Sequence, residues 1–503
     1  MSGHAPPADS STEPVLVAGM GATCGVSAEE VRALLDVALA ELGLDASAVT
    51  AIATVDAQAR EPGLAALAAD LAVPLVPYPA ADLARVPNPA PDAPTATPNV
   101  AEAAALLDLP GWRAGRPGAA VELLVGKTAS PRATVALARH WVADLRHHGD
   151  AELLGDSLDA ADGGPAGNET GRTGAAGLRD FAVNVSTEPL PPWLAEAITT
   201  ACGQLAGYPR PQAATAAAIA RHRRQAGEVL LTAGASEAFT LLAQGIPAGL
   251  AAVVHPQFTE PEVALRAAGW RVHRVLTDAA DGWALHPDRV PDSADLVVIG
   301  NPTNPTGTLH SRQALLALRR PGRLVVIDEA FADAVPGEPE SLADAGDLTG
   351  VVVVRSLTKT WGLAGLRIGY LLGDATAIAA AAAVQPHWSV SGPALAAAEA
   401  CLADSALPEA HRRAVTGAAH RQALADELAR RGFEVPADAV GPFVLTRHPR
   451  RPRLHAELRA AGFAVRRADT FPGLGPGWVR IAVRDPASTA PLLAAIDRLL
   501  GGS

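Results

Sequence analysis

Between residues 229 and 358 the chain repeats a pattern that restricts the fold more than any other feature. Runs of Val, Ile, Leu and Ala of strand length alternate with turns and helices, and these runs read VLLTAG, AAVVHP, LVVIGNP, RLVVIDEAF and VVVVRSLT. Strands that are apolar along their whole length are buried on both faces, which is typical of a parallel or mixed sheet covered by helices. The sequence therefore predicts an α/β fold whose large sheet is mostly parallel.

The length of the chain requires more than one folded domain. Its 503 residues exceed what a single hydrophobic core serves, and 49 % of them are hydrophobic, which is enough for sizeable cores. Changes in composition divide the sequence into a disordered tail over residues 1–13, a small α/β domain over 14–143 and a large part over 144–503 with a flexible Gly-rich loop over 156–177.

Hydrophobic residues in the small domain follow two patterns, one typical of strands and the other typical of helices. We expect strands at 15–21, 49–56, 71–78 and 121–127, helices at 27–42, 100–107 and 133–142, and a Pro-rich loop over 88–97. Together these elements make a compact α/β domain of common size.

Charge and cysteine content exclude several kinds of partner. The chain has 41 Lys and Arg against 53 Asp and Glu, a net charge of −12, so we expect no broad surface for nucleic acid or anionic membrane. Cys24, Cys202 and Cys401 share no metal-binding or disulfide spacing, which predicts no metal site and a reducing compartment. The sequence shows neither a signal peptide nor a run long enough to span a membrane, so we expect a soluble cytoplasmic protein.

Four polar residues follow successive buried strands. The strand LVVI is followed by GNPTNPTG, which contains Asn304, and the next strand ends at Asp328. The strand VVVV leads to RSLTKTWGLAGLRIGY, which contains Lys359 and, eight positions later, Arg367. Each residue alone has an ordinary explanation as a turn residue, a helix cap or a surface charge. Together they mark the carboxyl edge of one sheet, where open α/β sheets bind ligands.

These motifs resemble the aspartate aminotransferase superfamily, the fold-type I enzymes that use pyridoxal phosphate (PLP), over about residues 179–503. The resemblance implies a large PLP-binding subdomain over about 225–400 and a small α/β subdomain over 401–503. It also implies that the catalytic Lys359 holds PLP as a Schiff base, that Asp328 pairs with the pyridine nitrogen and makes the ring an electron sink, and that Asn304 bonds the ring 3′-oxygen.

The same resemblance assigns the rest of the cofactor site. Gly234, Ala235 and Ser236 open a helix after a strand, so their backbone N–H groups can face the coenzyme phosphate. The remaining positions implied by the resemblance are Ser356 and Arg367 in the phosphate cup, Phe258 stacked on the pyridine ring, and Tyr208 reaching the phosphate of a neighbouring subunit. The role of Tyr208 implies a homodimer.

One position beside the cofactor departs from the family pattern. Phe331 stands where many aminotransferases have Tyr, three residues after Asp328. Phenylalanine cannot donate a hydrogen bond to the 3′-oxygen. This argues against tuning specific to an aminotransferase, without excluding transamination.

Within the superfamily, several segments resemble the histidinol-phosphate aminotransferase branch and, most closely, the threonine-phosphate decarboxylase group of the cobalamin pathway. They read DFAVNV at 180–185, QPHWSV at 385–390, and FPGL at 471–474 ahead of WVRIAVR at 478–484. HHGD at 147–150 resembles that group's His-Gly-Gly segment, from which Asp150 departs. The resemblance implies a substrate with a carboxylate and a phosphate, bound by Arg480, Arg466, His148, Gly149 and Asn184, with Arg467 and Arg484 as second choices.

The reaction depends on which Cα bond of the substrate stands perpendicular to the PLP ring. The carboxylate there gives decarboxylation and the hydrogen there gives transamination or racemisation, and two bound anionic ends can fix that choice. Our first hypothesis is decarboxylation of L-threonine O-3-phosphate to (R)-1-aminopropan-2-yl phosphate, and the alternative is an aminotransferase of the histidinol-phosphate type. Threonine and serine phosphate differ by one methyl, which motifs do not resolve. An inactive PLP protein is poorly supported, because Asn304, Asp328, Lys359 and Arg367 are all present.

Residues 14–143 resemble the CobE/CbiG C-terminal domain of cobalamin biosynthesis. The motifs are GMGATCG at 19–25, TVD at 54–56, PNVAEAA at 98–104 and Gly-Lys at 126–127, and Gln58 stands where that family often has Lys. The Gly-rich turn could bind an anion or a corrin intermediate, but a tight strand-to-helix turn is the simpler account, and Glu102 could be an N-terminal helix charge. A third hypothesis is that this domain binds a corrinoid or a pathway enzyme and delivers the PLP half to it.

Overall fold

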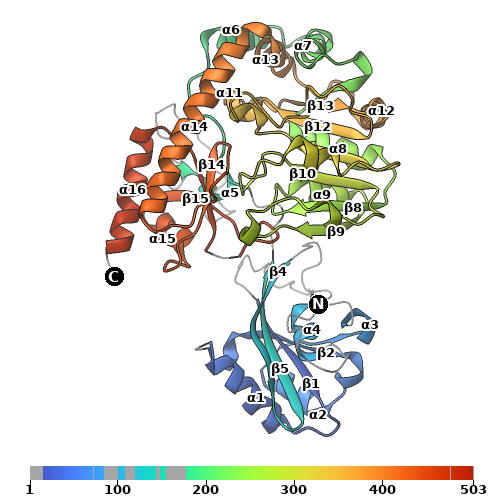
Figure 1. The fold of residues 1–503 in the computed structure, drawn as a ribbon, viewed down its shortest axis with the longest axis vertical. Coiled ribbons are helices and arrows are strands. Elements are labelled where there is room, and N and C mark those ends of the chain that lie inside the picture. The colour runs from blue at the N-terminus through green and yellow to red at the C-terminus, as the bar shows by residue number, and fades with distance from the viewer. Residues whose placement is uncertain are drawn as a thin grey trace, which may run out of the picture. The chain divides into compact units, whose positions relative to one another are not determined.

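The computed structural model describes residues 15–42, 44–71, 73–83, 100–107, 119–142, 145, 148–154, 177–475 and 477–501. The chain forms two compact units, residues 1–144 and residues 145–503 (Figure 1). The α/β class expected from the sequence is confirmed. The expected tail at 1–13, the loop at 88–97 and all but the last residue of the Gly-rich segment 156–177 lie outside the described residues.

The N-terminal unit is built on a mixed five-stranded sheet. Its strand order is β3-β2-β1-β5-β4, in which β1, β2 and β3 are parallel and β5 runs antiparallel to both of its neighbours. The elements are β1 (Val15–Ala22), α1 (Ala28–Ala40), β2 (Val49–Val55), α2 (Pro62–Asp70), β3 (Leu75–Tyr78), α3 (Ala80–Leu83), α4 (Val100–Leu106), β4 (Ala119–Ala129) and β5 (Ala133–Val142).

Helices cover both faces of this sheet. Ser27 caps α1 by accepting a hydrogen bond from the Glu30 backbone N–H at 3.1 Å, and α1 and α2 pack one apolar cluster against β1. On the other face, α4 approaches β1 so closely that a Cβ added at Gly19 would lie 2.0 Å from the Ala101 carbonyl oxygen. Gly19 of the Gly-rich motif is therefore required by the packing of α4 on β1.

The segment 133–142, expected as a helix, is strand β5, so that prediction was wrong. It pairs antiparallel with the whole of β1. Val135 and Leu137 join the cluster on one face, whereas Ala136 and Ala138 join the cluster on the other. The strand preference of a sequence depends on its context, and here the pairing with a distant strand decides the structure.

The second unit, residues 145–503, contains a seven-stranded sheet of order β7-β13-β12-β11-β10-β8-β9. Strand β13 runs antiparallel to its two neighbours and the other pairs are parallel. The strands are β7 (Val229–Thr232), β8 (Leu250–His255), β9 (Arg271–Leu276), β10 (Leu296–Gly300), β11 (Leu324–Asp328), β12 (Val351–Ser356) and β13 (Gly369–Gly373).

Helices cover both faces of the large sheet, as the uninterrupted apolar strands predict (Figure 1). One face carries α6 (Pro192–Cys202), α7 (Gln212–His222) and α13 (Gly392–Leu402), and the other carries α8 (Ala235–Gly245), α9 (Glu260–Ala267) and α12 (Ala375–Val384). Two short helices, α10 (Arg312–Leu316) and α11 (Thr358–Trp361), follow strands β10 and β12.

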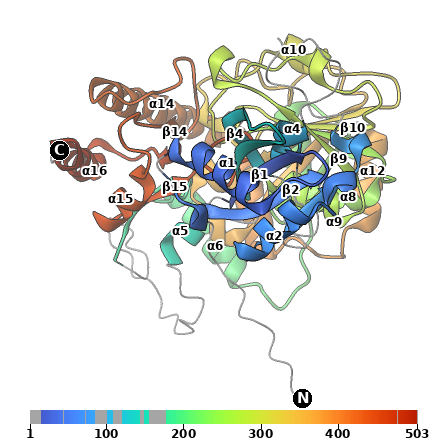
Figure 2. The same cartoon turned by 90° about the horizontal axis from the view of Figure 1, so that it is seen from below.

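A four-stranded sheet forms the small subdomain, with strand order β14-β16-β15-β6. Its elements are β6 (Arg179–Phe181), α14 (Leu407–Arg430), β14 (Phe443–Thr446), α15 (Leu454–Ala460), β15 (Phe463–Arg467), β16 (Val479–Ala482) and α16 (Pro486–Gly501), and the short α5 (Ala151–Leu154) packs against β15. In both views α14, α15 and α16 gather around β14 and β15 (Figure 1, Figure 2). Within the described residues, none of the helices is both long and apolar enough to span a bilayer.

Candidate active site

The carboxyl edge of the large sheet brings together segments that are far apart in the sequence. Gly369 pairs with Ser356 on one side and with Thr232 on the other. Because β13 is antiparallel to both neighbours, its first residue lies beside the last residues of β12 and β7. The loop after β7, the start of α11 and Arg367 therefore converge at one edge.

Gly234 shapes a cradle at this edge. Its φ of 84° lies in the left-handed region, and an added Cβ would lie 2.8 Å from Arg367 Nη2. Gly234 also caps α8, and the first backbone N–H groups of a helix, here those of Ala235 and Ser236, have no acceptor within it. These N–H groups, a guanidinium and the buried Ser356 hydroxyl are donors suited to a phosphate, so the cradle fits the coenzyme phosphate that the resemblance implies.

Lys359 lies in α11, directly after β12. Burial, reinforced by the charges of Arg480 and Arg367, lowers the pKa of Lys359 from 10.5 to about 8, while Asp328 and Asp150 oppose this shift. A lysine with this pKa keeps a sizeable neutral fraction near neutral pH, and the neutral amine is the nucleophile. The side chain can therefore attack a carbonyl group.

Asp328 and Asn304 lie at the ends of the next two strands. Asp328 is 7 % exposed, and burial raises its pKa to about 6 even though the Ala330 N–H donates to Oδ1 at 3.0 Å. A cationic partner, such as a protonated pyridine nitrogen, stabilises the charged form of a carboxylate that is so poorly solvated. Asn304, in the loop after β10, accepts a hydrogen bond from Arg480 Nη1 at 2.7 Å.

Two aromatic side chains border the same region. The half-buried Phe258 ring lies 5.4 Å from the His148 ring and 6.4 Å from Phe239, measured between centroids. Phe331 is buried, packs edge-on against Phe443 at 5.2 Å, and its centroid lies 5.8 Å from Lys359 Nζ. Phe331 is thus close to Lys359 but has no group that can donate or accept a conventional hydrogen bond.

Arg480 is the best-anchored cation of the site. It is 5 % exposed, and burial, together with the charge of Arg466, lowers its pKa. Its Nη2 donates to the Ala182 carbonyl at 2.5 Å, in addition to the bond to Asn304. The hydrogen-bonding pattern places the Asn184 amide oxygen toward Arg480, 3.1 Å from Nε and 3.0 Å from Nη1.

Arg466 lies directly opposite Arg480 in the antiparallel pair of β15 and β16. Its side chain is 1 % exposed, its Nη1 donates to the Arg467 carbonyl at 2.6 Å, and Glu152 Oε1 lies 3.7 Å away. Arg467 and Arg484, the alternative substrate-binding residues, already have other partners. Arg467 bonds Asp469, and Arg484 bonds the Val183 carbonyl at 2.8 Å. Arg466 and Arg480 are therefore two buried guanidinium groups, and the carboxylates of Glu152 and Asp180 act on the charge of Arg480.

The segment 148–150 is held against Ala182, whose carbonyl also accepts a hydrogen bond from Arg480. His148 Nε2 lies 2.6 Å from Glu260 Oε1, and a Cβ added at Gly149 would lie 2.5 Å from the Ala182 carbonyl oxygen. Asp150 is exposed, yet its charge acts on Lys359. The Gly149 position thus requires glycine for a close backbone approach.

Tyr208 is not brought to this site within the single chain. It is 74 % exposed and stacks on Trp388, which is 58 % exposed, with the ring centroids 4.3 Å apart. Trp388 also has a φ of 59°, an uncommon conformation for a bulky residue.

Sequence reasoning did not single out four residues that the structure brings into this description. Trp388, which stacks on Tyr208, and Asp150, whose charge acts on Lys359, lay in segments quoted only for a resemblance. Glu260, which fixes His148, was detectable as an acidic residue in the first turn of α9. Phe443, which packs on Phe331, could not be identified because only the tertiary fold brings the two rings together.

The N-terminal motifs gather around the end of β1. The Ala22 N–H donates to Gln58 Oε1 at 3.1 Å, the Gly25 N–H donates to Glu61 Oε2 at 2.9 Å, and Arg132 Nη2 donates to the Cys24 carbonyl at 2.6 Å. These hydrogen bonds come from the same unit and fix the Gly-rich turn. They favour the interpretation of the motif as a tight strand-to-helix turn. Glu102 is buried, and its Oε1 accepts from the Lys127 N–H at 2.8 Å where the pairing of β4 with β5 is irregular.

Two family models match the chain. Residues 178–496 match the family described as aminotransferase class I and II. Residues 16–138 match the family described as cobalamin synthesis G C-terminus. The two resemblances drawn from sequence motifs are therefore confirmed.

Relatives of the larger part carry the names of different enzymes. A Mycobacterium tuberculosis protein named histidinol-phosphate aminotransferase is 47 % identical over 313 residues, which cover 62 % of this chain and 85 % of the relative. A Salmonella typhimurium protein named threonine-phosphate decarboxylase is 31 % identical over 342 residues, which cover 65 % of this chain and 92 % of the relative.

Solved structures agree on the fold. The histidinol-phosphate aminotransferase from Clostridium acetobutylicum matches with a TM-score of 0.59 at 22 % identity and covers 64 % of this chain and 99 % of its own. The L-threonine-O-3-phosphate decarboxylase from Porphyromonas gingivalis matches with a TM-score of 0.55 at 24 % identity, with the same coverage.

Proposed function

The chain belongs to the class I and II aminotransferase family of PLP-dependent enzymes, and from this premise we propose that it decarboxylates L-threonine O-3-phosphate to (R)-1-aminopropan-2-yl phosphate. The observation that carries the proposal is the buried pair Arg466 and Arg480, of which Arg480 helps to lower the pKa of Lys359, on a chain whose N-terminal unit matches a cobalamin synthesis family. Two buried guanidinium groups suit a substrate with two anionic ends.

The residues at the sheet edge divide into two groups by role. In the proposed enzyme, Lys359 would form the covalent link to PLP, Asp328 would pair with the pyridine nitrogen, Asn304 would bond the 3′-oxygen, Phe258 would stack on the ring, and Gly234, Ala235, Ser236, Ser356 and Arg367 would hold the phosphate. Bound PLP supplies an electron sink for the substrate bond that breaks. Arg480 would bind the carboxylate end, and Arg466, His148, Gly149 and Asn184 would surround the substrate phosphate.

Two anion sites fix how a substrate is oriented, which either reaction requires. A substrate held at both ends cannot rotate freely about its Cα, so Arg480 and Arg466 would determine which bond at Cα breaks. Phe331 offers no hydrogen-bond donor to the 3′-oxygen, unlike the tyrosine found in many aminotransferases.

A PLP-dependent aminotransferase of the histidinol-phosphate type is the second candidate. It is favoured by the 47 % identical relative of that name. The same two arginines would then bind a phosphorylated amino donor and its keto-acid partner in turn.

We further propose that the enzyme acts as a homodimer. Tyr208 and Trp388 form an exposed aromatic pair, and large exposed aromatic groups mark surfaces that meet a partner. In the dimer, Tyr208 contributes to the phosphate site of the neighbouring subunit.

The N-terminal unit has the separate proposed role of binding a corrinoid intermediate or a pathway enzyme. Deletion of residues 1–143 tests that role through corrinoid binding, partner association and cobalamin production.

Release of carbon dioxide tests the proposed reaction. Purified PLP-loaded protein is incubated with O-phospho-L-threonine, with O-phospho-L-serine in parallel, and with Lys359→Ala as the control. We expect release by the wild type alone. Conversion of histidinol phosphate and 2-oxoglutarate to glutamate without carbon dioxide release would replace the decarboxylase with the aminotransferase.

A further inference from the structure

His148 and Glu260 form a hydrogen-bonded pair that is partly open to solvent. His148 Nε2 lies 2.6 Å from Glu260 Oε1, and the two side chains are 33 % and 25 % exposed. Glu260 lies in the first turn of α9, and His148 lies in the segment before α5. Both side chains therefore have surface that a ligand can reach.

The segment that carries His148 is attached to the residues that precede Glu260 along the chain. The Thr259 hydroxyl donates to the Leu145 carbonyl at 2.5 Å, and the Phe258 ring lies 5.4 Å from the His148 ring, measured between centroids. Together with the bond to Glu260, these contacts restrict the imidazole at one edge and on one face. Three consecutive residues thus set the orientation of His148.

The residues that follow His148 reach the proposed substrate site. A Cβ added at Gly149 would lie 2.5 Å from the Ala182 carbonyl oxygen, and Arg480 Nη2 donates to the same oxygen at 2.5 Å. The charge of Asp150, the next residue, acts on the amine of the proposed catalytic lysine. The imidazole therefore belongs to a segment that lies against the residues assigned to the substrate.

The Glu260 carboxylate is paired with one residue. Among the residues that the structure describes, His148 is its only hydrogen-bond or ion-pair partner. Glu262, two positions later, differs, because its side chain is 0 % exposed and lies 2.8 Å from both His255 and Arg274. Glu262 is thus part of the buried interior, whereas the charge of Glu260 acts at a surface beside the site.

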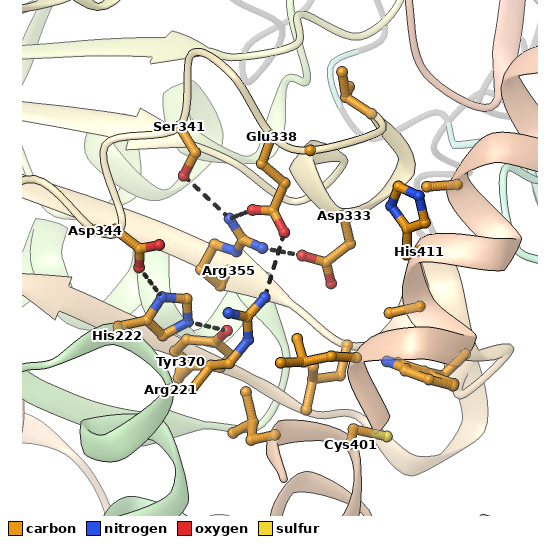
Figure 3. Close-up of a pocket in the computed structure, with 18 of the residues that line it drawn as sticks. Arg221, His222, Asp333, Glu338, Ser341, Asp344, Arg355, Tyr370, Cys401 and His411 are labelled. Atoms are coloured by element: carbon orange, nitrogen blue, oxygen red, sulfur yellow. Dashed lines mark hydrogen bonds and ion pairs between the residues drawn. The ribbon is translucent and has the colours of Figure 1, made fainter. Parts of the chain in front are cut away.

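Charged side chains elsewhere in the second unit are paired within the protein. A cavity of about 530 Å³ is lined by residues of α7, β12 and α14 among others (Figure 3). In its wall Arg355 donates to Glu338 at 2.7 Å and to Asp333, and Arg221 lies 3.8 Å from Glu338. The charges of Arg355, Glu338 and Asp333 are thus satisfied by one another.

The protons on the His148 ring follow from its neighbours in a complex with substrate. An ionised carboxylate only accepts hydrogen bonds, so Nε2 carries a proton toward Glu260. Within the described part of the chain, Nδ1 has no hydrogen-bond partner. A neutral imidazole would present a lone pair at Nδ1 and repel a phosphate oxygen. A ring between the carboxylate and a phosphate has an anionic acceptor at each nitrogen, so it takes up a second proton from water and donates from both.

We propose that Glu260 is a positioning residue, which orients the His148 ring and pairs with its charge so that Nδ1 donates to the phosphate of the substrate. The pair therefore favours phosphorylated amino acids over their unphosphorylated forms, in addition to the preference that the two buried arginines give. This inference rests on the proposed function, in which His148 contacts the substrate phosphate. It does not depend on which bond at Cα breaks.

Glu260→Gln tests the proposal because glutamine keeps an oxygen acceptor and loses the negative charge. Dissociation constants for O-phospho-L-threonine and L-threonine are measured with the full-length holoenzyme, from the change in absorbance of bound PLP before turnover. We expect the variant to bind O-phospho-L-threonine about tenfold more weakly and L-threonine as the wild type does. KM for the phosphorylated substrate should rise by a similar factor, whereas kcat should change little.

A double-mutant cycle tests whether Glu260 acts through His148. In a His148→Ala background, Glu260→Gln should have no further effect on the binding of O-phospho-L-threonine. The exposed Glu196→Gln in α6 is the matched control and should leave both dissociation constants unchanged. Equal weakening for the two amino acids would overturn the proposal, and so would an undiminished effect in the His148→Ala background.

Failure of the proposed reaction gives a different result from failure of this inference. For an aminotransferase, histidinol phosphate and histidinol replace the two threonine compounds, and Glu260→Gln should weaken only the phosphorylated one. A wild type that prefers the phosphorylated compound, with a Glu260→Gln variant that binds it equally well, would overturn this inference alone. A wild type without that preference in either pair of compounds would overturn both this inference and the proposed phosphorylated substrate.

Discussion

Arg480 Nη1 donates a hydrogen bond to Asn304 Oδ1 across 2.7 Å. The two residues come from different subdomains, since Asn304 follows β10 of the large sheet and Arg480 lies in β16 of the small sheet. The bond joins the residue proposed to contact the cofactor ring with the residue proposed to bind the substrate carboxylate. A substrate that engages Arg480 therefore acts directly on the surroundings of the ring.

Replacing Arg480 should separate substrate binding from cofactor binding. We expect Arg480→Gln to lower kcat/KM for the phosphorylated amino acid by about 10²-fold or more, because a charge-assisted contact worth roughly 3 kcal/mol is lost. PLP content, read from absorbance of the purified protein, should stay close to that of the wild type. The exposed Arg498→Gln in α16 is the matched control. Loss of PLP together with activity would contradict the assignment of Arg480 to the substrate.

Gly234 offers a test of the phosphate cradle. Gly234→Ala should weaken PLP binding about tenfold or more, because alanine strains the backbone at a φ of 84° and its Cβ would meet Arg367 Nη2 at 2.8 Å. Gly365→Ala is the matched control, since an added Cβ there meets no atom within 4 Å and the residue lies only two positions from Arg367. PLP titration of the cofactor-free variants measures both affinities. Equal affinities would show that the cradle does not hold the phosphate.

The large sheet and its polar edge were predictable because each depends on local sequence. Unbroken Val and Ile runs specify strands buried on both faces, and a polar residue directly after such a strand must lie at the carboxyl edge. Asp328 and Ser356 illustrate this rule, since each is the last residue of its strand.

Features that depend on contacts between distant segments were not predictable. Segment 133–142 was expected as a helix, and its pairing with β1 makes it a strand. The pairing of β6 with β15 joins residue 179 to a sheet formed otherwise by the C-terminal hundred residues, and no local pattern indicates it. The contacts of Arg480 with Ala182 and Asn304 arise in the same way.

The lowered pKa of Lys359 predicts that this residue destabilises the cofactor-free protein. The folded chain holds the lysine proton less tightly than the unfolded chain does, so the charged form costs folding free energy at every pH below about 8. We expect Lys359→Met to raise the free energy of unfolding at pH 7 by up to about 3 kcal/mol. The difference should shrink as the pH rises from about 8 toward 10.5.

Urea unfolding of the cofactor-free proteins across this pH range measures the effect of Lys359→Met. The chain contains two lysines, Lys127 and Lys359, so the exposed Lys127→Met is the natural control and should change stability little. A difference between Lys359→Met and the wild type that is independent of pH would mean that the lysine is not buried as a cation.

The packing of α4 on β1 predicts that the N-terminal unit can be destabilised by itself. An added Cβ at Gly19 would lie 2.0 Å from the Ala101 carbonyl oxygen and 2.4 Å from the Ala105 backbone nitrogen, and neither backbone atom can move without displacing α4. We expect Gly19→Ala to destabilise this unit by about 2 kcal/mol or more. Amide hydrogen exchange in β1 and β2 of the full-length protein should accelerate, whereas the reaction at Lys359, which lies in the other compact unit, should keep its rate.

Gly126→Ala is the control for Gly19→Ala, because its Cβ would only approach the Glu102 side chain at 3.5 Å. Equal exchange in both variants would show that Gly19 is not required for the packing of α4. A parallel loss of catalysis would show that the two units depend on each other for stability.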